Sequence, residues 1–243
     1  MNVASEIILT KESGIATILL NRPEKYNAFT TSMVLEWKEA LTDCREDESV
    51  KVIVLTGAGT AFCSGGDVNA MGEWIDQSAL ERKNRLWNEV HTIPKILYTI
   101  DKPIIAAING MALGAGLDMA LMCDLRIASD KAKFAEAYVK VGLVPGDGGA
   151  YFLPRLVGLS KALELLWSGK MIDAAEAEKI GLVNMVVSSD ILEAKTYELA
   201  QQLANGPSIA IRAIKRAVYK GLTMDLDTHL DYISSLYAIV TET

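Results

Sequence analysis

Two glycine-rich loops, each directly after an apolar run, constrain this chain more than any other feature. The first loop covers residues 61–67 and follows the apolar run 52–56; the second covers 109–118 and follows 103–108. Short apolar runs bounded by glycine are typical of buried strands, and small loop residues let a ligand approach the backbone closely. Where such a loop leads into a helix, the first N–H groups have no intrahelical acceptor. Two loops of this kind can aim two N–H donors at one carbonyl oxygen, which is an oxyanion hole.

The apolar pattern predicts strands that alternate with helices. We expect strands over residues 6–20 (two strands turned at 12–14), 50–55, 103–108 and 125–128. We expect helices over residues 31–44, 115–122, 173–181, 191–205, 207–220 and 224–239, and a largely helical stretch over 69–99 with a break at Pro94. Short links between strands and helices favour parallel pairing, so the expected fold class is α/β.

Length, charge and cysteine usage exclude several classes of protein. The 243 residues are half apolar, enough for one substantial core, but no apolar run approaches the ~20 residues that span a bilayer. Residues 1–5 lack the pattern of a signal peptide, so we expect a cytoplasmic protein. The net charge of −7 disfavours nucleic acid as a partner. Three cysteines without a CxxC pair indicate reduced thiols rather than disulfides.

Other functional motifs are excluded because the residues that they require are absent from the sequence. A dinucleotide fingerprint that begins at Gly114 finds Met119 at its third glycine position, and one that begins at Gly57 finds Phe62. Ser64 is not in a nucleophile elbow, because Phe62 replaces the required glycine. Without HExxH or CxxC, the sequence predicts no metal site.

Four segments in order resemble the crotonase superfamily, the enoyl-CoA hydratase/isomerase fold. They are residues 21–28 (NRPEKYNA), the two glycine-rich loops, residues 134–149, and residues 177–183 (AEKIGLV). The resemblance implies a spiral of strand-strand-helix repeats over residues 1–200 and a helical C-terminal trimerisation region over 201–243. It also implies an acyl-CoA thioester as substrate, no separate cofactor, and a homotrimer or a dimer of trimers.

The resemblance also assigns binding residues. Gly66 and Ala115 correspond to the two N–H donors of the family's oxyanion hole. The positions that correspond to the family's substrate- and CoA-binding segments are Lys25, Tyr26, Ala28, Ser64, Gly65, Asp67, Val68, Met111 and Gly114.

The acid–base positions depart from the family pattern. Hydratases of this superfamily carry two glutamates, and the corresponding positions here are Asp118 and Tyr138. Hydration needs a water held between two carboxyl groups, one acting as base and the other as acid. Aspartate is shorter than glutamate by one methylene, and a phenol with an ordinary pKa of ~10 is a weak base. The two-glutamate mechanism therefore does not transfer directly.

Three other residues are candidates to replace the missing glutamate. Asp147 lies in a Pro-Gly-Asp-Gly-Gly segment, one residue after the position, here Gly146, at which some isomerases and dehalogenases of the superfamily carry an aspartate. The same aspartate also suits an Asx turn. His91 can act as a base at neutral pH or serve as a packing residue. Glu136 lies two residues before Tyr138, which makes its reach to the same place doubtful.

The sequence thus predicts an acyl-CoA enzyme that works through a thioester enolate, by hydration or double-bond isomerisation of an enoyl-CoA. Two alternatives stay open. One is a CoA-thioester hydrolase or ring-cleaving hydrolase of the same fold. The other is a protein that binds CoA thioesters with little turnover.

Overall fold

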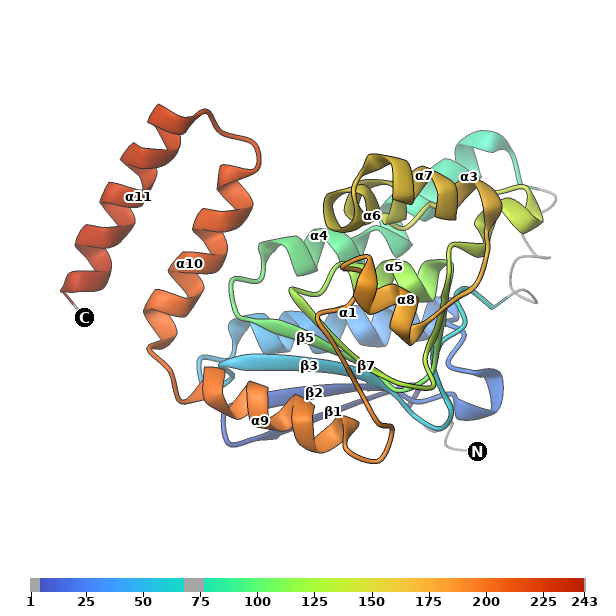
Figure 1. Cartoon of the computed structure of the whole chain (residues 1–243), viewed down its shortest axis with the longest axis horizontal. Coiled ribbons are helices and arrows are strands. Elements are labelled where there is room, and N and C mark those ends of the chain that lie inside the picture. Colours follow the sequence, from blue (N-terminus) through green and yellow to red (C-terminus); the bar gives the residue numbers. More distant parts are fainter. Residues whose placement is uncertain (1–4, 68–76, 243) are drawn as a thin grey trace.

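Strands alternate with helices in the computed structural model, which describes residues 5–67 and 77–242. The larger sheet has the order β1-β2-β3-β5-β7-β10 (Figure 1). Its strands are β1 (Ile7–Glu12), β2 (Ile15–Leu20), β3 (Val52–Gly57), β5 (Ile104–Ile108), β7 (Leu125–Ser129) and β10 (Met185–Val187). The hairpin β1-β2 is antiparallel, and every later pairing in this sheet is parallel, as the short strand–helix links predict.

A smaller sheet of very short strands continues the larger one. It has the order β4-β6-β8-β9, with β4 (Ala61–Cys63), β6 (Met111–Leu113), β8 (Lys133–Ala135) and β9 (Ile172–Asp173). Each of the first three follows a strand of the larger sheet after a short turn. Helix α5 (Ala115–Leu121) follows β6, and a 3-10 turn (Ala137–Val141) follows β8. This recurrence is the strand-strand-helix repeat that the sequence resemblance implies.

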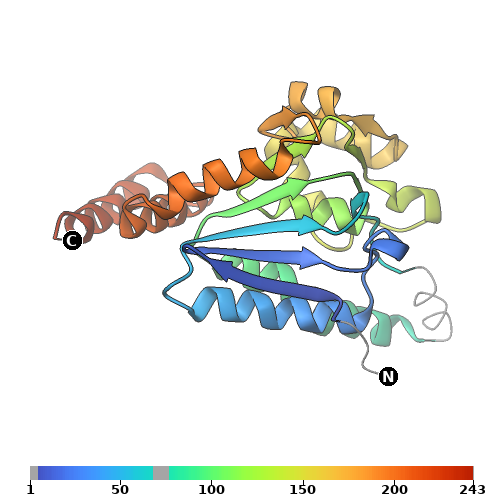
Figure 2. The same cartoon turned by 90° about the horizontal axis from the view of Figure 1, so that it is seen from below.

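Helices cover both faces of the larger sheet (Figure 2). Alternate residues of β3 separate the two layers: Ile53 and Leu55 belong to the main core under α1 (Thr31–Glu46), whereas Val52 and Val54 pack under α9 (Leu192–Ala204). This is the period of two that a strand buried on both faces requires.

The long helical stretch before β5 breaks earlier than the sequence predicts. Helix α3 (Ala79–Arg85) continues into a wider helical turn over Leu86–Val90, and α4 (Thr92–Thr99) begins after His91. The break predicted at Pro94 is therefore wrong. Pro94 lies in the first turn of α4, where a backbone N–H has no intrahelical acceptor and proline is tolerated.

The segment between the site and the C-terminal helices is helical. It contains α6 (Gly149–Val157), α7 (Leu159–Ser168) and α8 (Ala174–Lys179). The predicted signals bound α8: the Asp173 side chain accepts a hydrogen bond from Glu176 N, and Gly181 adopts a φ of 77° just after the helix ends.

Helices α10 (Ser208–Gly221) and α11 (Leu226–Thr241) project away from the sheets (Figure 1). Lys215 pairs with Asp124 at 2.7 Å and Arg212 with Asp101 at 2.8 Å, which ties α10 to the core. Several large apolar side chains of this pair are exposed, namely Ile209, Ile214, Val218, Leu222, Leu226, Leu230, Tyr237 and Ile239. Ile211 and Ile233 of the same two helices are half-buried. In the described part of the chain, no helix has the length and hydropathy to cross a membrane.

Candidate active site

The site lies where three neighbouring strands of the smaller sheet end. Strands β4, β6 and β8 are parallel and adjacent, so their carboxyl ends share one edge. The Gly65–Gly66 loop follows β4, Gly114 and α5 follow β6, and Glu136 with the 3-10 turn follows β8. Adjacent parallel strands thereby bring residues from three distant segments to one place.

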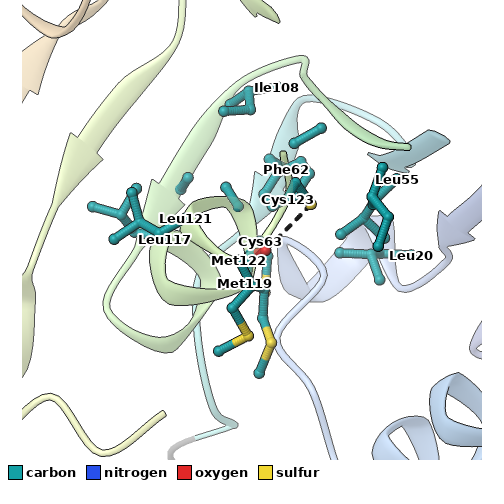
Figure 3. Packing of buried hydrophobic residues seen from close by; sticks show 14 of the residues in the cluster. Leu20, Leu55, Phe62, Cys63, Ile108, Leu117, Met119, Leu121, Met122 and Cys123 are labelled. Atoms are coloured by element: carbon teal, nitrogen blue, oxygen red, sulfur yellow. Dashed lines mark hydrogen bonds between the residues drawn. The ribbon is translucent and has the colours of Figure 1, made fainter. Parts of the chain in front are cut away.

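Glycine is required where the first loop meets α5. A Cβ on Gly116 would lie 2.2 Å from the carbonyl oxygen of Cys63, so only glycine lets α5 pack this closely on β4. All seven residues of α5 are buried. Figure 3 shows Leu117, Met119, Leu121 and Met122 around this helix among the buried side chains that include Phe62 and Cys63. The position of α5 relative to the first loop is therefore fixed by packing.

The N–H groups of Gly66 and Ala115 have no acceptor among the described residues. Phe29 pairs with the first loop on both sides of Gly66: its N–H donates to Gly65 O at 2.9 Å, and Asp67 N–H donates to Phe29 O at 3.0 Å. This pairing leaves Gly66 N–H unused. A Cβ on Gly65 would lie 3.6 Å from Ala115 N, so the two loops are in close contact. Both predicted donors thus belong to adjoining backbone segments.

The Tyr138 hydroxyl lies between two aspartates. It is 2.7 Å from Asp118 Oδ2 and 3.0 Å from Asp147 Oδ2. The ring packs against Gly114, whose φ of 50° and ψ of −123° suit glycine alone; a Cβ there would lie 3.7 Å from the ring. The structure therefore brings together three of the five acid–base candidates, Asp118, Tyr138 and Asp147, beside the second loop.

The two aspartates and Glu136 form a buried cluster of carboxyl groups. Asp118, Glu136 and Asp147 are 0%, 1% and 6% exposed, and no lysine or arginine of the described ranges forms an ion pair with them. Burial raises the pKa of Asp118 to about 7, against the hydrogen bond from Tyr138, which lowers it. Burial also raises the pKa of Asp147, while Tyr138 and His91 lower it. Burial is thus the main cause of both shifts.

The pKa values of Glu136 and Tyr138 are also raised. Burial, followed by the charge of Asp118, raises the pKa of Glu136 to about 10. Burial and the charges of Asp118 and Asp147 raise the pKa of Tyr138 far above its ordinary value. Burial and the neighbouring carboxyl groups therefore favour the protonated forms of Glu136 and Tyr138.

His91 contacts the cluster through the backbone. Its Nε2 forms a 2.7 Å hydrogen bond with the carbonyl oxygen of Gly146, next to Asp147. The ring also makes an edge contact with Trp87, with 5.8 Å between ring centroids. The histidine is therefore placed to orient the loop that carries Asp147.

The other predicted binding residues gather around the first loop. Lys25 and Tyr26 are exposed, and Ser64 N donates to Tyr26 O at 3.0 Å, which holds the two segments together. Ala28 is buried, Gly65 has a φ of 98°, and Asp67 pairs with Arg22 at 3.2 Å. Met111 begins β6, three residues before Gly114, and is half-buried. Val68 lies outside the described residues.

Sequence reasoning gave too little weight to two residues. Glu136 is almost fully buried within the cluster, and Arg22 joins Asp67 to Glu6, with 2.9 Å between Arg22 Nε and Glu6 Oε1. Glu136 follows the end of β8 and Tyr138 lies in the 3-10 turn, so no strand periodicity in the sequence relates the two residues. For Arg22, no sequence signal distinguishes an ion pair from a solvent-exposed cation.

Comparison with known proteins places these features in context. Residues 10–242 match the family described as enoyl-CoA hydratase/isomerase. The crotonyl-CoA hydratase of Syntrophomonas wolfei is 38% identical over 224 residues, 91% of this chain and 84% of the relative. The 1,2-epoxyphenylacetyl-CoA isomerase of Escherichia coli is 36% identical over 227 residues, 93% of this chain and 87% of the relative. A crystal structure of the enoyl-CoA hydratase from Bacillus anthracis is 34% identical and superposes with a TM-score of 0.91, covering 98% of this chain and 92% of that one.

Proposed function

Because this chain belongs to the enoyl-CoA hydratase/isomerase family, we propose that it moves a proton on an acyl-CoA thioester through an enolate held at Gly66 and Ala115. The reaction we favour is double-bond isomerisation. The observation that carries the proposal is the Tyr138 hydroxyl between Asp118 and Asp147, beside the two unused N–H groups. Acid–base groups and oxyanion donors are the two parts that enolate chemistry requires.

In this mechanism the thioester carbonyl oxygen accepts hydrogen bonds from the N–H groups of Gly66 and Ala115. Asp147, as the carboxylate, takes a proton from the carbon next to the thioester carbonyl of a 3-enoyl ester. The electron pair of the broken C–H bond enters the conjugated system, and negative charge develops on the carbonyl oxygen. Return of a proton to a different carbon completes the shift of the double bond. One oxyanion donor contributes on the order of 3 kcal/mol to such a transition state.

The Tyr138 hydroxyl, which lies between the two aspartate carboxyl groups, favours isomerisation over hydration. Hydration needs a water molecule held by an acid and a base. Here the Tyr138 hydroxyl lies 2.7 Å from Asp118 Oδ2 and 3.0 Å from Asp147 Oδ2, and its raised pKa keeps it a neutral phenol. Proton transfer between carbons needs no added water. The arrangement therefore suits isomerisation better.

Hydration is the second candidate, and the pKa of Asp118 favours it. Burial raises this pKa to about 7, so the group can donate a proton at neutral pH, as the acid of a hydratase must. Hydration by this route requires water to reach the substrate from a side other than that of Tyr138. The crotonyl-CoA hydratase relative gives this candidate its second support.

The CoA part of the substrate is proposed to lie along the first loop. Lys25 and Tyr26 are exposed beside Ser64, and an ammonium group and an aromatic face suit phosphate and adenine respectively. The assembly proposed is a homotrimer or a dimer of trimers formed through α10 and α11. Their exposed apolar side chains exceed what a monomer ordinarily leaves uncovered.

Two measurements test the function. Isothermal calorimetry with acetyl-CoA, CoA and acetate checks that CoA thioesters bind and that free acids do not. Mass spectrometry after incubation in heavy water with saturated, 2-enoyl and 3-enoyl CoA esters then checks proton exchange and products. We expect exchange at carbon and interconversion of the 2- and 3-enoyl esters. A mass gain of one water without interconversion selects hydration instead, and absence of both binding and exchange rejects the proposal.

A further inference from the structure

Glu136 is the one member of the carboxyl cluster that the proposed function does not use. Its side chain is 1% exposed, and neither Oε1 nor Oε2 has a hydrogen-bond donor among the described residues. Oδ1 of Asp118 lacks a donor in the same way. These oxygens surround one point, because a Cβ on Gly149 would lie 2.2 Å from Asp118 Oδ1 and 3.0 Å from Glu136 Oε1. A buried oxygen without a donor is costly, so at least one of these carboxyl groups carries a proton.

The number of protons in the cluster follows from its contacts. The Tyr138 hydroxyl has one proton and can donate it to one aspartate at a time, yet it contacts both. The second contact is a hydrogen bond only if that carboxyl group is protonated and donates to the phenol oxygen. The Glu136–Asp118 contact needs one more proton. Two carboxyl protons thus satisfy every contact, and a single negative charge remains on the cluster.

We propose that Glu136 is a positioning residue that keeps its proton and donates it to Oδ1 of Asp118, so that one negative charge alternates between Asp118 and Asp147 through Tyr138. The catalytic consequence rests on the function proposed above. Burial supports the assignment, since it raises the pKa of Glu136 to about 10. The ionisable groups that face Glu136 are Asp118 on α5, Tyr138 on the 3-10 turn and Asp147 before α6.

The two forms of the cluster differ by the movement of two protons. In the first form Asp147 is ionised and accepts from Tyr138, while Asp118 is protonated and donates to the phenol oxygen. When Asp147 gains a proton from substrate carbon, it can donate to Tyr138. Asp118 can then release its own proton to substrate and become the ionised group, held by Tyr138 and Glu136. Protons and charge balance, and Glu136 remains protonated throughout.

The variants Glu136→Gln and Glu136→Leu separate this role from a titrating one. Glutamine keeps a donor toward Asp118, so we expect a rate within about threefold of the parent and an unchanged pH–rate profile. Leucine removes the donor and leaves ionised Asp118 less stabilised. A hydrogen bond to a charged group favours the charged form, so without it the pH–rate profile should move up by about one to two pH units. Rescue by glutamine alone distinguishes positioning from loss of packing.

A spectroscopic readout does not depend on turnover. At pH 8.5, above the pKa of Asp118, infrared difference spectra between the parent and Glu136→Gln should show the C=O stretch of one protonated carboxylic acid in the parent. Absence of that band, or loss of activity by 10²-fold or more in Glu136→Gln, overturns the inference, as do unchanged profiles in both variants. If the parent enzyme neither exchanges nor converts any acyl-CoA, the proposed function fails while the infrared result still decides the state of Glu136.

Discussion

Replacing Tyr138 with phenylalanine removes one oxygen atom and keeps the ring that packs against Gly114. The hydroxyl contacts both Asp118 and Asp147, and its hydrogen bonds lower the pKa of each. In Tyr138→Phe both pKa values therefore rise further. The native state then holds its protons to a higher pH than the unfolded chain, in which an aspartate titrates near ~3.9. The stability of the variant should fall more steeply with pH than that of the parent.

The sign and size follow from the ionised forms. Below about pH 4 the carboxyl groups are protonated in both states, and the hydroxyl contributes an ordinary hydrogen bond of about 1 kcal/mol. As pH rises through the Asp118 pKa of about 7, the parent itself loses stability, because burial disfavours the carboxylate. The variant also loses a hydrogen bond to a charged group, worth about 1.5–3 kcal/mol. We expect the destabilisation by Tyr138→Phe to grow from about 1 kcal/mol at pH 4 to about 1.5–3 kcal/mol at pH 8.

Urea unfolding at pH 4 and pH 8, at one fixed protein concentration, measures this difference. Tyr98→Phe is a matched control, because Tyr98 is 53% exposed on α4, away from the carboxyl cluster. Its unfolding free energy should equal that of the parent at both pH values. Equal destabilisation by Tyr138→Phe at pH 4 and pH 8 would refute the reasoning, since the hydroxyl would then not be bound to an ionised carboxyl group.

Two further predictions concern the aspartates and the assembly. Asp147→Asn should lose on the order of 10²–10⁴ in turnover while keeping CoA affinity, and Asp118→Asn should lose less; steady-state rates with calorimetry compare them, and the reverse order would make Asp118 the main base. Light scattering at micromolar concentration should give three or six times the mass of the chain. Leu222→Glu, just after α10, together with Leu230→Glu on α11 replaces two exposed leucines and should reduce that mass; a monomeric parent would contradict the prediction.

The strand and helix order could be predicted because the local signals agree with the fold. Glycines mark the turns between β1 and β2 (Gly14) and between β3 and β4 (Gly59), and the apolar runs 15–20, 52–57 and 104–108 are strands. The Pro94 prediction was wrong because proline is compatible with the first turn of a helix as well as with a break. Sequence periodicity predicts α10 and α11 as helices but does not say how the two helices meet, so their mutual contact is known from the structure alone.

The candidate site was predictable in its members and not in its geometry. The sequence identifies Asp118, Tyr138 and Asp147 one by one, but it presents the two aspartates as alternative proton-transfer groups. Only the adjacent ends of β6 and β8 place both on one hydroxyl. The buried position of Glu136 beside Asp118 was equally hidden, because the spacing of residues encodes neither burial nor the proximity of two side chains.

Gly149→Ala provides the most direct test of how tightly the carboxyl cluster is packed. An added Cβ would lie 2.2 Å from Asp118 Oδ1, well inside contact distance, so this carboxyl group must move and its contact with Tyr138 must lengthen. The backbone conformation at this position is compatible with alanine, because Gly149 is the first residue of α6 and its φ is not positive. Displacement of a catalytic group by about 1 Å costs on the order of 10²-fold in rate. We therefore expect Gly149→Ala to fold, to keep its CoA affinity and to lose about 10²-fold in turnover. Gly146→Ala is the matched control in the same loop, since its Cβ would meet Leu86 at an ordinary 3.5 Å. Full activity in Gly149→Ala would mean that Asp118 can leave its place without consequence, and that the proton path does not run through it.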